Sequence, residues 1–135
     1  MSANVYLSAD ELLFRGKLDL ERDALTVLLL GETYTPDLVS HSKLIHVVEH
    51  ESTGPGYERQ RLTGQRIARD DAGKSVALFA DDVEWPEATV SAKYVVIVRG
   101  DDLVGVADFG VVKSSGDAPF SVHWNASGVM RLKGK

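Results

Sequence analysis

The sequence predicts an all-β protein: an antiparallel β-sandwich of about eight short strands, with a short N-terminal helix and one short helical turn. Over much of the chain, apolar and polar residues alternate with the period of two that buries one face of a strand. Gly, Asp, Asn and Ser residues separate these segments at short intervals and supply turns. This number and spacing of segments is typical of a sandwich, and eight strands suit a jelly roll.

The clearest alternation runs from Thr89 to Arg99, where every even position is apolar, so a long strand with one buried face is expected. The segment from Leu25 to Leu30 is apolar on both faces and predicts a fully buried strand. The remaining strands are expected at Arg66 to Arg69 and Ser75 to Phe79, which form a hairpin, and at Leu103 to Phe109, Phe120 to Trp124 and Val129 to Leu132.

The 135 residues are expected to form a single domain, 1–135, because this length supports one hydrophobic core and is too short for two. Residues 1–8 are interpreted as an N-terminal arm ahead of the sandwich. After the arm, Ser8 and Glu11 have the spacing of a helix capping box, and Gly16 is well placed to end the helix.

Composition and charge disfavour several classes of function. The formal net charge is −5, and the one gathering of basic residues, Arg59, Arg61, Arg66 and Arg69, is interpreted as a solvated surface, so nucleic acid is not an expected partner. Apolar runs fall far short of the roughly 20 residues of a membrane span. The first residues lack the pattern of a signal peptide, which predicts synthesis and folding in the cytoplasm. The absence of cysteine excludes disulfides and thiolate chemistry.

The stretch His46-Val47-Val48-Glu49-His50 has the residue order of one type of zinc peptidase, in which two histidines share a helix face. The β-branched valines favour a strand, and a strong breaker follows from Ser52 to Gly56. We expect a short helical turn from Ser40 to Ile45 that gives way to extended chain, which separates the two histidines. No later helix offers a third ligand, so we expect no metal site and no peptidase activity.

Other chemical motifs have structural interpretations. Gly73-Lys74-Ser75 ends like a phosphate-binding loop, but it lacks the earlier glycine and opens a strand. Paired acids stand where the alternation stops and are interpreted as turn formers, with calcium binding near Asp81, Asp82 and Glu84 as the exception to consider. Ser121 and His123 share a strand face without a supporting triad. We therefore expect no catalytic residues, no cofactor and no enzyme.

An ordered series of segments carries a resemblance to a known family. The series comprises YTPD at Tyr34–Asp37, His41, GPGY at Gly54–Tyr57, LTG at Leu62–Gly64, ADDVEW at Ala80–Trp85, AKYVVIV at Ala92–Val98, GVADFG at Gly105–Gly110 and FSVHWNASGVMRL at Phe120–Leu132. In this order and spacing, the chain resembles small virion structural proteins of tailed bacteriophages from about Gly16 onward. Within that group it looks most like a capsid cement or decoration protein of short-tailed phages.

The resemblance implies a jelly roll on the outer surface of the capsid, with no catalytic residues. A cement protein bridges subunits of the major capsid protein, and it is expected to associate with itself as a homodimer or homotrimer. The expected contact residues are Val5, Tyr6 and Leu7 of the arm, together with Pro55 and Tyr57 of the loop around these two residues. The arm could equally fold back onto its own core.

The alternative function is a tail- or fibre-associated module that recognises a host-surface glycan. Sugar faces stack on solvent-facing aromatic side chains, and Tyr57 and Trp85 are the residues expected to offer them. Trp124 falls on the apolar alternation of its strand and is expected in the core. A metal-dependent hydrolase that uses His46 is a third and least favoured class.

Overall fold

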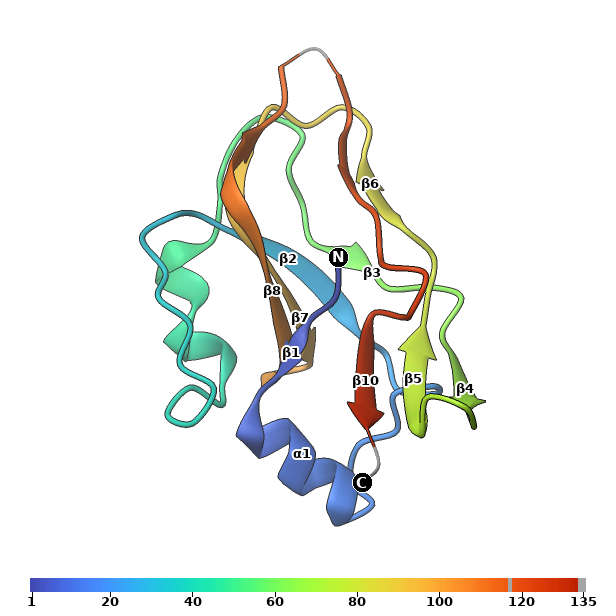
Figure 1. Ribbon diagram of the computed structural model, residues 1–135. Coiled ribbons are helices and arrows are strands. Elements are labelled where there is room, and N and C mark those ends of the chain that lie inside the picture. Colours follow the sequence, from blue (N-terminus) through green and yellow to red (C-terminus); the bar gives the residue numbers. More distant parts are fainter. Residues whose placement is uncertain (117, 134–135) are drawn as a thin grey trace.

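The computed structural model describes residues 1–116 and 118–133. These residues form mostly β structure, arranged as open antiparallel sheets around one hydrophobic core (Figure 1). This agrees with the predicted all-β sandwich class. Within the described part of the chain, no helix has the length and apolar character needed to cross a membrane.

A five-stranded sheet forms the centre of the molecule, with the strand order β1-β8-β7-β2-β3. Its strands are β1 (Asn4–Val5), β2 (Thr26–Leu30), β3 (Gln60–Arg61), β7 (Ser91–Arg99) and β8 (Asp102–Ser114). Strand β7 is the middle strand and pairs antiparallel with both β2 and β8. Its residues from Tyr94 to Val98 are buried, because this strand carries apolar side chains on both faces.

Two smaller sheets complete the fold. One has the order β10-β5-β4 and contains β4 (Arg66–Asp70), β5 (Ser75–Phe79) and β10 (Met130–Lys133). The other pairs β6 (Val83–Trp85) with β9 (Phe120–Val122). The predicted hairpin around Gly73 is confirmed, since Asp70 pairs with Ser75 and its carboxylate accepts a hydrogen bond from the Gly73 amide. Side chains from all three sheets contribute to the same core.

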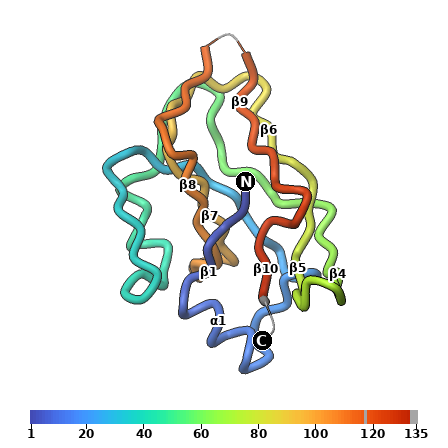
Figure 2. The backbone as a smooth tube through the Cα atoms, in the orientation of Figure 1, coloured from blue at the N-terminus to red at the C-terminus, as the bar shows by residue number. Residues whose placement is uncertain are grey.

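The N-terminal residues fold back onto the core of their own chain. Strand β1 pairs with β8, and Tyr6 is completely buried. The Tyr6 and Tyr34 hydroxyls share a buried hydrogen bond of 2.7 Å. Burial and this neighbour raise the pKa of Tyr6 far above its usual range. Figure 2 shows the N-terminal segment running beside β8 before it enters the helix.

Helix α1 (Leu7–Phe14) begins two residues earlier than predicted, because its N-cap is Tyr6 and not Ser8, and the capping box at Ser8 is absent. The cause is tertiary contact: the Leu38 carbonyl accepts the Leu7 amide, and the Val104 carbonyl accepts the amide of Tyr6, the residue that precedes the helix. The predicted C-terminus is confirmed, because Gly16 adopts a φ of +69° and its amide donates to the Leu13 carbonyl.

Two 3-10 turns, η1 (Leu44–His46) and η2 (Val48–His50), occupy the stretch that contains both histidines of the zinc-like motif. The predicted helical turn therefore lies later than expected, and the prediction of extended chain from His46 to His50 is wrong. Burial of Val47 between the two turns outweighs the strand preference of the β-branched residues.

Strand β8 is longer than predicted and contains a bulge of several residues opposite β7. Ala92 pairs with Lys113 and Tyr94 pairs with Asp108, so four residues of β8 stand opposite the single residue Lys93 of β7. Gly110 lies in this bulge with a φ of +85°, a conformation that residues with a side chain rarely adopt. The bulge, residues 109–112, lies toward the end of the molecule opposite α1 (Figure 1).

Strand β4 forms one edge of its sheet, and all five of its residues are exposed. The amide of Ile67 in this strand donates a hydrogen bond of 3.0 Å to the carboxylate of Glu21. A side chain from a distant segment therefore binds a backbone group on the open edge.

The loop from Gly54 to Tyr57 packs against the segment that precedes β7. The Thr89 amide donates to the Pro55 carbonyl at 2.8 Å. Gly56 has a φ of +76°, and a Cβ atom at this position would overlap the carbonyl oxygen of Glu87. Gly100 has a similar φ of +57° but has open space around it.

This difference predicts the outcome of two matched substitutions. Gly100→Ala should cost about 1 kcal/mol of the free energy of unfolding, the strain of a left-handed alanine. Gly56→Ala should cost about 3 kcal/mol, because backbone overlap adds to the same strain. Urea unfolding followed by circular dichroism measures both values. Equal costs for the two variants would contradict the packing of this loop.

Candidate functional site

Three of the four histidines gather around the buried ring of Tyr34. The Tyr34 hydroxyl shares a hydrogen bond of 2.9 Å with Nδ1 of His41. The rings of His41 and His50 each lie 5.5 Å from the Tyr34 ring, measured between centroids. His46 stacks on His41 at 5.7 Å. The segment from His41 to His50 therefore packs around the Tyr34 side chain.

His46 and His50 have separate structural partners. Nδ1 of His46 accepts two backbone hydrogen bonds of 3.1 Å, from the amides of Ser42 and Lys43. Nδ1 of His50 shares a hydrogen bond of 2.9 Å with the Thr33 hydroxyl. No group of three or more metal-ligating side chains occurs within residues 1–116 and 118–133. The contacts that these histidines do make fix the conformation of the segment.

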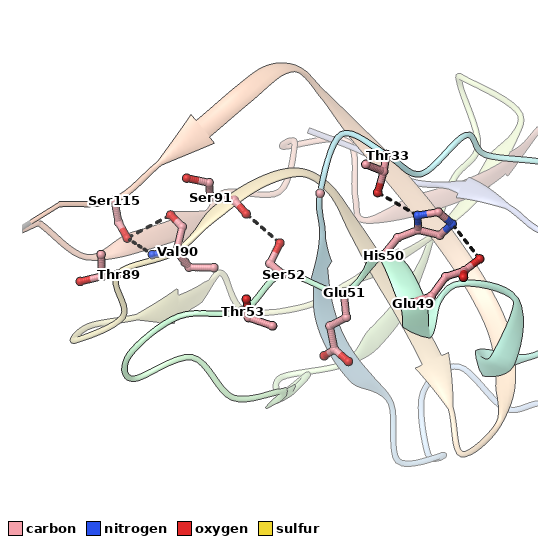
Figure 3. Close-up of a pocket in the computed structure, with 11 residues that line it drawn as sticks. Thr33, Glu49, His50, Glu51, Ser52, Thr53, Thr89, Val90, Ser91 and Ser115 are labelled. Carbon is pink, nitrogen blue, oxygen red and sulfur yellow. Dashed lines mark hydrogen bonds and ion pairs between the residues drawn. The ribbon is translucent and has the colours of Figure 1, made fainter.

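A polar groove of about 390 Å³ lies beside His50. Figure 3 shows its lining residues, which come from the chain after β2, from η2 and the segment that follows it, from the chain that leads into β7, and from the chain after β8. Two of its serine hydroxyls bind backbone carbonyls: Ser52 donates to the Ser91 carbonyl at 2.7 Å, and Ser115 donates to the Ala88 carbonyl at 2.6 Å. The third, that of Ser91, shares a hydrogen bond of 2.6 Å with the Ser114 hydroxyl. A serine that donates its proton to a carbonyl oxygen is not activated by a base, so these contacts hold segments together.

Glu51, at the edge of the groove, is the centre of a cluster that includes both a cation and a phenol. Arg59 binds its two carboxylate oxygens at 3.0 and 2.7 Å, and the Tyr57 hydroxyl donates to one of them at 2.7 Å. Burial opposes ionisation of Glu51, but these hydrogen bonds outweigh it and lower its pKa. The Tyr57 hydroxyl also accepts the Leu29 amide of β2, so the cluster ties the loop to the central sheet.

The three aromatic residues considered for sugar stacking, Tyr57, Trp85 and Trp124, lie partly or fully in the core. Trp85 is only 1% exposed, its indole N–H donates to the Glu58 carbonyl, and its ring stacks on Tyr57 at 6.3 Å. The expectation that Trp85 faces solvent is therefore wrong, because β6 turns this face toward the core and against Phe120. Trp124 is partly buried and packs against the core.

The acidic residues considered for calcium point to different partners. Asp82 binds the His123 ring at 2.9 Å and accepts the Trp124 amide, and these contacts lower the pKa of Asp82. Asp81 accepts the Thr63 hydroxyl, and Glu84 lies within β6. The arginines are also separate: Arg59 binds Glu51, Arg69 binds Asp71, and Arg66 lies over the ring of Phe79.

Large apolar side chains are exposed at several places, among them Ile45, Val48 and Ile67, and two groups of such side chains form candidate surfaces. The first surface, named the α1 face, consists of Leu7, Phe14, Val39 and Leu132 around a groove beside α1. The second, named the β8 bulge, exposes Val111 and Val112. Exposed apolar side chains that gather in one place are typical of surfaces that contact other proteins. These are the candidate functional surfaces of the chain.

The structure separates the five residues predicted to make contacts. Tyr6 lies in the core, Val5 pairs within the sheet, and the Tyr57 hydroxyl is bound to Glu51. Leu7 and Pro55 are exposed, and Leu7 belongs to the α1 face.

Phe14, Val111 and Val112 were not among the contact residues predicted from the sequence. One signal was present for the helix, because Leu12, Leu13 and Phe14 cannot all lie on one helix face. Leu12 and Leu13 pack against the core, which leaves Phe14 93% exposed.

Comparison with known proteins found no matching family model, no matching curated protein and no matching solved structure.

The Glu51 cluster predicts a pH-dependent contribution to stability. Because the folded-state pKa of Glu51 is lowered, its stabilisation is full above about pH 5 and is lost as the pH falls through the folded value. Glu51→Gln should lower the free energy of unfolding by about 1–2 kcal/mol at pH 7, and this difference should shrink at about pH 3.

Urea unfolding at several pH values tests this expectation. Glu87→Gln is the matched control, because Glu87 is exposed and forms no ion pair with any described residue; its effect should stay within about 0.5 kcal/mol. A Glu51→Gln difference that is equally large at both pH values would contradict the assigned role of the carboxylate.

Proposed function

We propose that this chain is a structural protein of a bacteriophage virion, a capsid cement protein that binds the outer surface of the shell and bridges major capsid subunits. The ordered segments from YTPD to FSVHWNASGVMRL support the assignment to this class. The single structural observation that carries it is the β8 bulge, which holds two valines in solvent at one end of the molecule.

The β8 bulge suits docking onto another protein. Val111 is 66% exposed, although a valine on a regular strand of this sheet would pack against a neighbour. The amide of Gly110 binds the Asp108 carboxylate at 2.7 Å, which fixes the start of the bulge. Lys113 lies over the rings of Phe109 and Phe120 beside it. The partner surface would therefore offer an apolar hollow with acidic groups at its rim.

Several copies of such a contact, engaged at once, would raise the overall affinity for the shell. Two valines bury little area, so a single copy would bind a shell weakly. A cement protein that bridges neighbouring subunits engages several sites at once, and the second contact is then intramolecular. The jelly-roll connectivity stays a prediction of the resemblance, supported by open antiparallel sheets around one core.

Immunogold labelling of phage particles with an antibody against this chain tests the position in the virion. Label distributed over the head is the expected result. Label confined to the tail or fibres would overturn the cement proposal in favour of host recognition. Particles without label, with the epitope shown to be accessible, would overturn the virion assignment itself.

The contact surface is tested by binding to purified shells that lack the chain. A variant with both Val111→Ser and Val112→Ser should bind roughly tenfold more weakly or worse, because binding then no longer buries two apolar side chains. Ile45→Ser is the matched control, since Ile45 is more exposed than either valine but lies in η1. Equal loss in both variants, or loss in neither, would contradict docking through the bulge.

A further inference from the structure

The α1 face has a regular composition along the helix. Leu7, Asp10, Glu11 and Phe14 are spaced by three and four residues, so they share the side of α1 that faces away from the core. The opposite side packs inward through Ala9, which is buried. The outer side therefore carries apolar residues at both ends and carboxylates between them.

The surface contains both a groove and a protrusion. A groove of about 530 Å³ is lined by Leu7, Ser8, Asp10, Glu11, Phe14, Val39 and Leu132. Phe14, the last residue of α1, stands almost entirely in solvent. A buried phenylalanine removes roughly 150 Å² or more from water, so leaving it exposed forfeits a large hydrophobic stabilisation.

The charges along the face are incompletely paired within the chain. Burial raises the pKa of Asp10, and this carboxylate forms no ion pair with any residue in the described ranges. Arg15 binds Glu11 through Nε at 3.0 Å and Nη2 at 2.9 Å. A guanidinium has five N–H donors, so Arg15 can bind a second carboxylate while keeping the first.

We propose that the α1 face is a self-association surface on which two copies of the chain pair about a two-fold axis, with their α1 helices antiparallel. Reversal of the helix direction brings Phe14 of one copy onto the groove beside the partner's Leu7. It also brings Arg15 toward the partner's Asp10, the carboxylate that lacks a cation. The same two contacts occur twice, as an isologous interface requires.

A second copy fits this surface because each copy offers both halves of each contact. The protruding ring and the groove lie on the same face, as do the free carboxylate and the arginine with free donors. A stable dimer buries about 800 Å² per partner, roughly a tenth of the 7573 Å² that the chain exposes. The α1 face is a compact centre for such a contact, and we expect a reversible dimer that forms at moderate concentration.

Sedimentation velocity of the whole chain over roughly a hundredfold range of concentration tests the proposal. The expected result is a monomer–dimer equilibrium that Phe14→Ser weakens tenfold or more, because each dimer loses two buried rings. Ile45→Ser is the matched control, because Ile45 is 77% exposed but belongs to neither the α1 face nor the β8 bulge, and it should leave the equilibrium unchanged. A chain that stays monomeric throughout, or a dimer that persists in Phe14→Ser, would overturn the proposal.

The antiparallel arrangement has its own test. Arg15→Glu should weaken the dimer several-fold, since it places like charges together across the axis, and Asp10→Arg is then combined with it as the reciprocal change. The variant with both changes should regain dimerisation, because the pair is restored with its signs exchanged. Circular dichroism checks that every variant stays folded. Failure of the double variant to regain dimerisation would overturn the antiparallel pairing.

The inference stands independently of the virion assignment, because both experiments use the isolated chain in solution. A dimer without head labelling would leave the α1 face intact and remove the cement function. Head labelling with a chain that stays monomeric would support the cement function and overturn pairing through the α1 face.

Discussion

Burial of β7 on both faces is the constraint on which the rest of the structure depends. Val95 and Ile97 are as buried as Val96 and Val98, so the strand requires apolar cover from both sides. Strands β2 and β8 pair with the backbone of β7, and side chains from the smaller sheets and α1 pack into the same core. At the end of the strand, Arg99 binds Asp102 and Asp23. Hydrogen bonds from the Asp19 amide and Arg99 lower the pKa of Asp23, and those from Lys43 and Arg99 lower the pKa of Asp102. The groove and the β8 bulge both lie where β7 begins.

Local patterns predicted the parts of the fold that local forces decide. Strands β2 and β7 follow from runs of apolar residues, and the β4–β5 hairpin follows from its turn residues. The start of α1 could not be predicted, because its amides bind the carbonyls of Leu38 and Val104 from distant segments. The turns around Val47 depend likewise on burial of that side chain. In each case a tertiary contact outweighed a correct local preference.

The candidate surfaces were harder to predict than the fold for the same reason. The β8 bulge is defined by a difference in register between two strands, which no single segment of sequence contains. The burial of Trp85 did have a signal, since Val83 and Trp85 alternate with Glu84.

The α1 face and the β8 bulge lie at opposite ends of one chain, and this arrangement bears on how a dimer could bind. A dimer joined through α1 would present two bulges, and such a particle could bridge two sites on a symmetric shell.

The hydrogen bond from the Ile67 amide to Glu21 has a consequence for crowded conditions. An exposed strand edge is a template on which another chain can add a strand, and such addition can continue into fibrous aggregates. Here a carboxylate occupies a backbone donor near the middle of β4, and an incoming strand would have to displace it and bring its own carbonyl close to a negative charge. A protein that accumulates in many copies on one surface experiences a very high local concentration. One glutamate from a distant loop thus hinders the addition of a further strand at this edge.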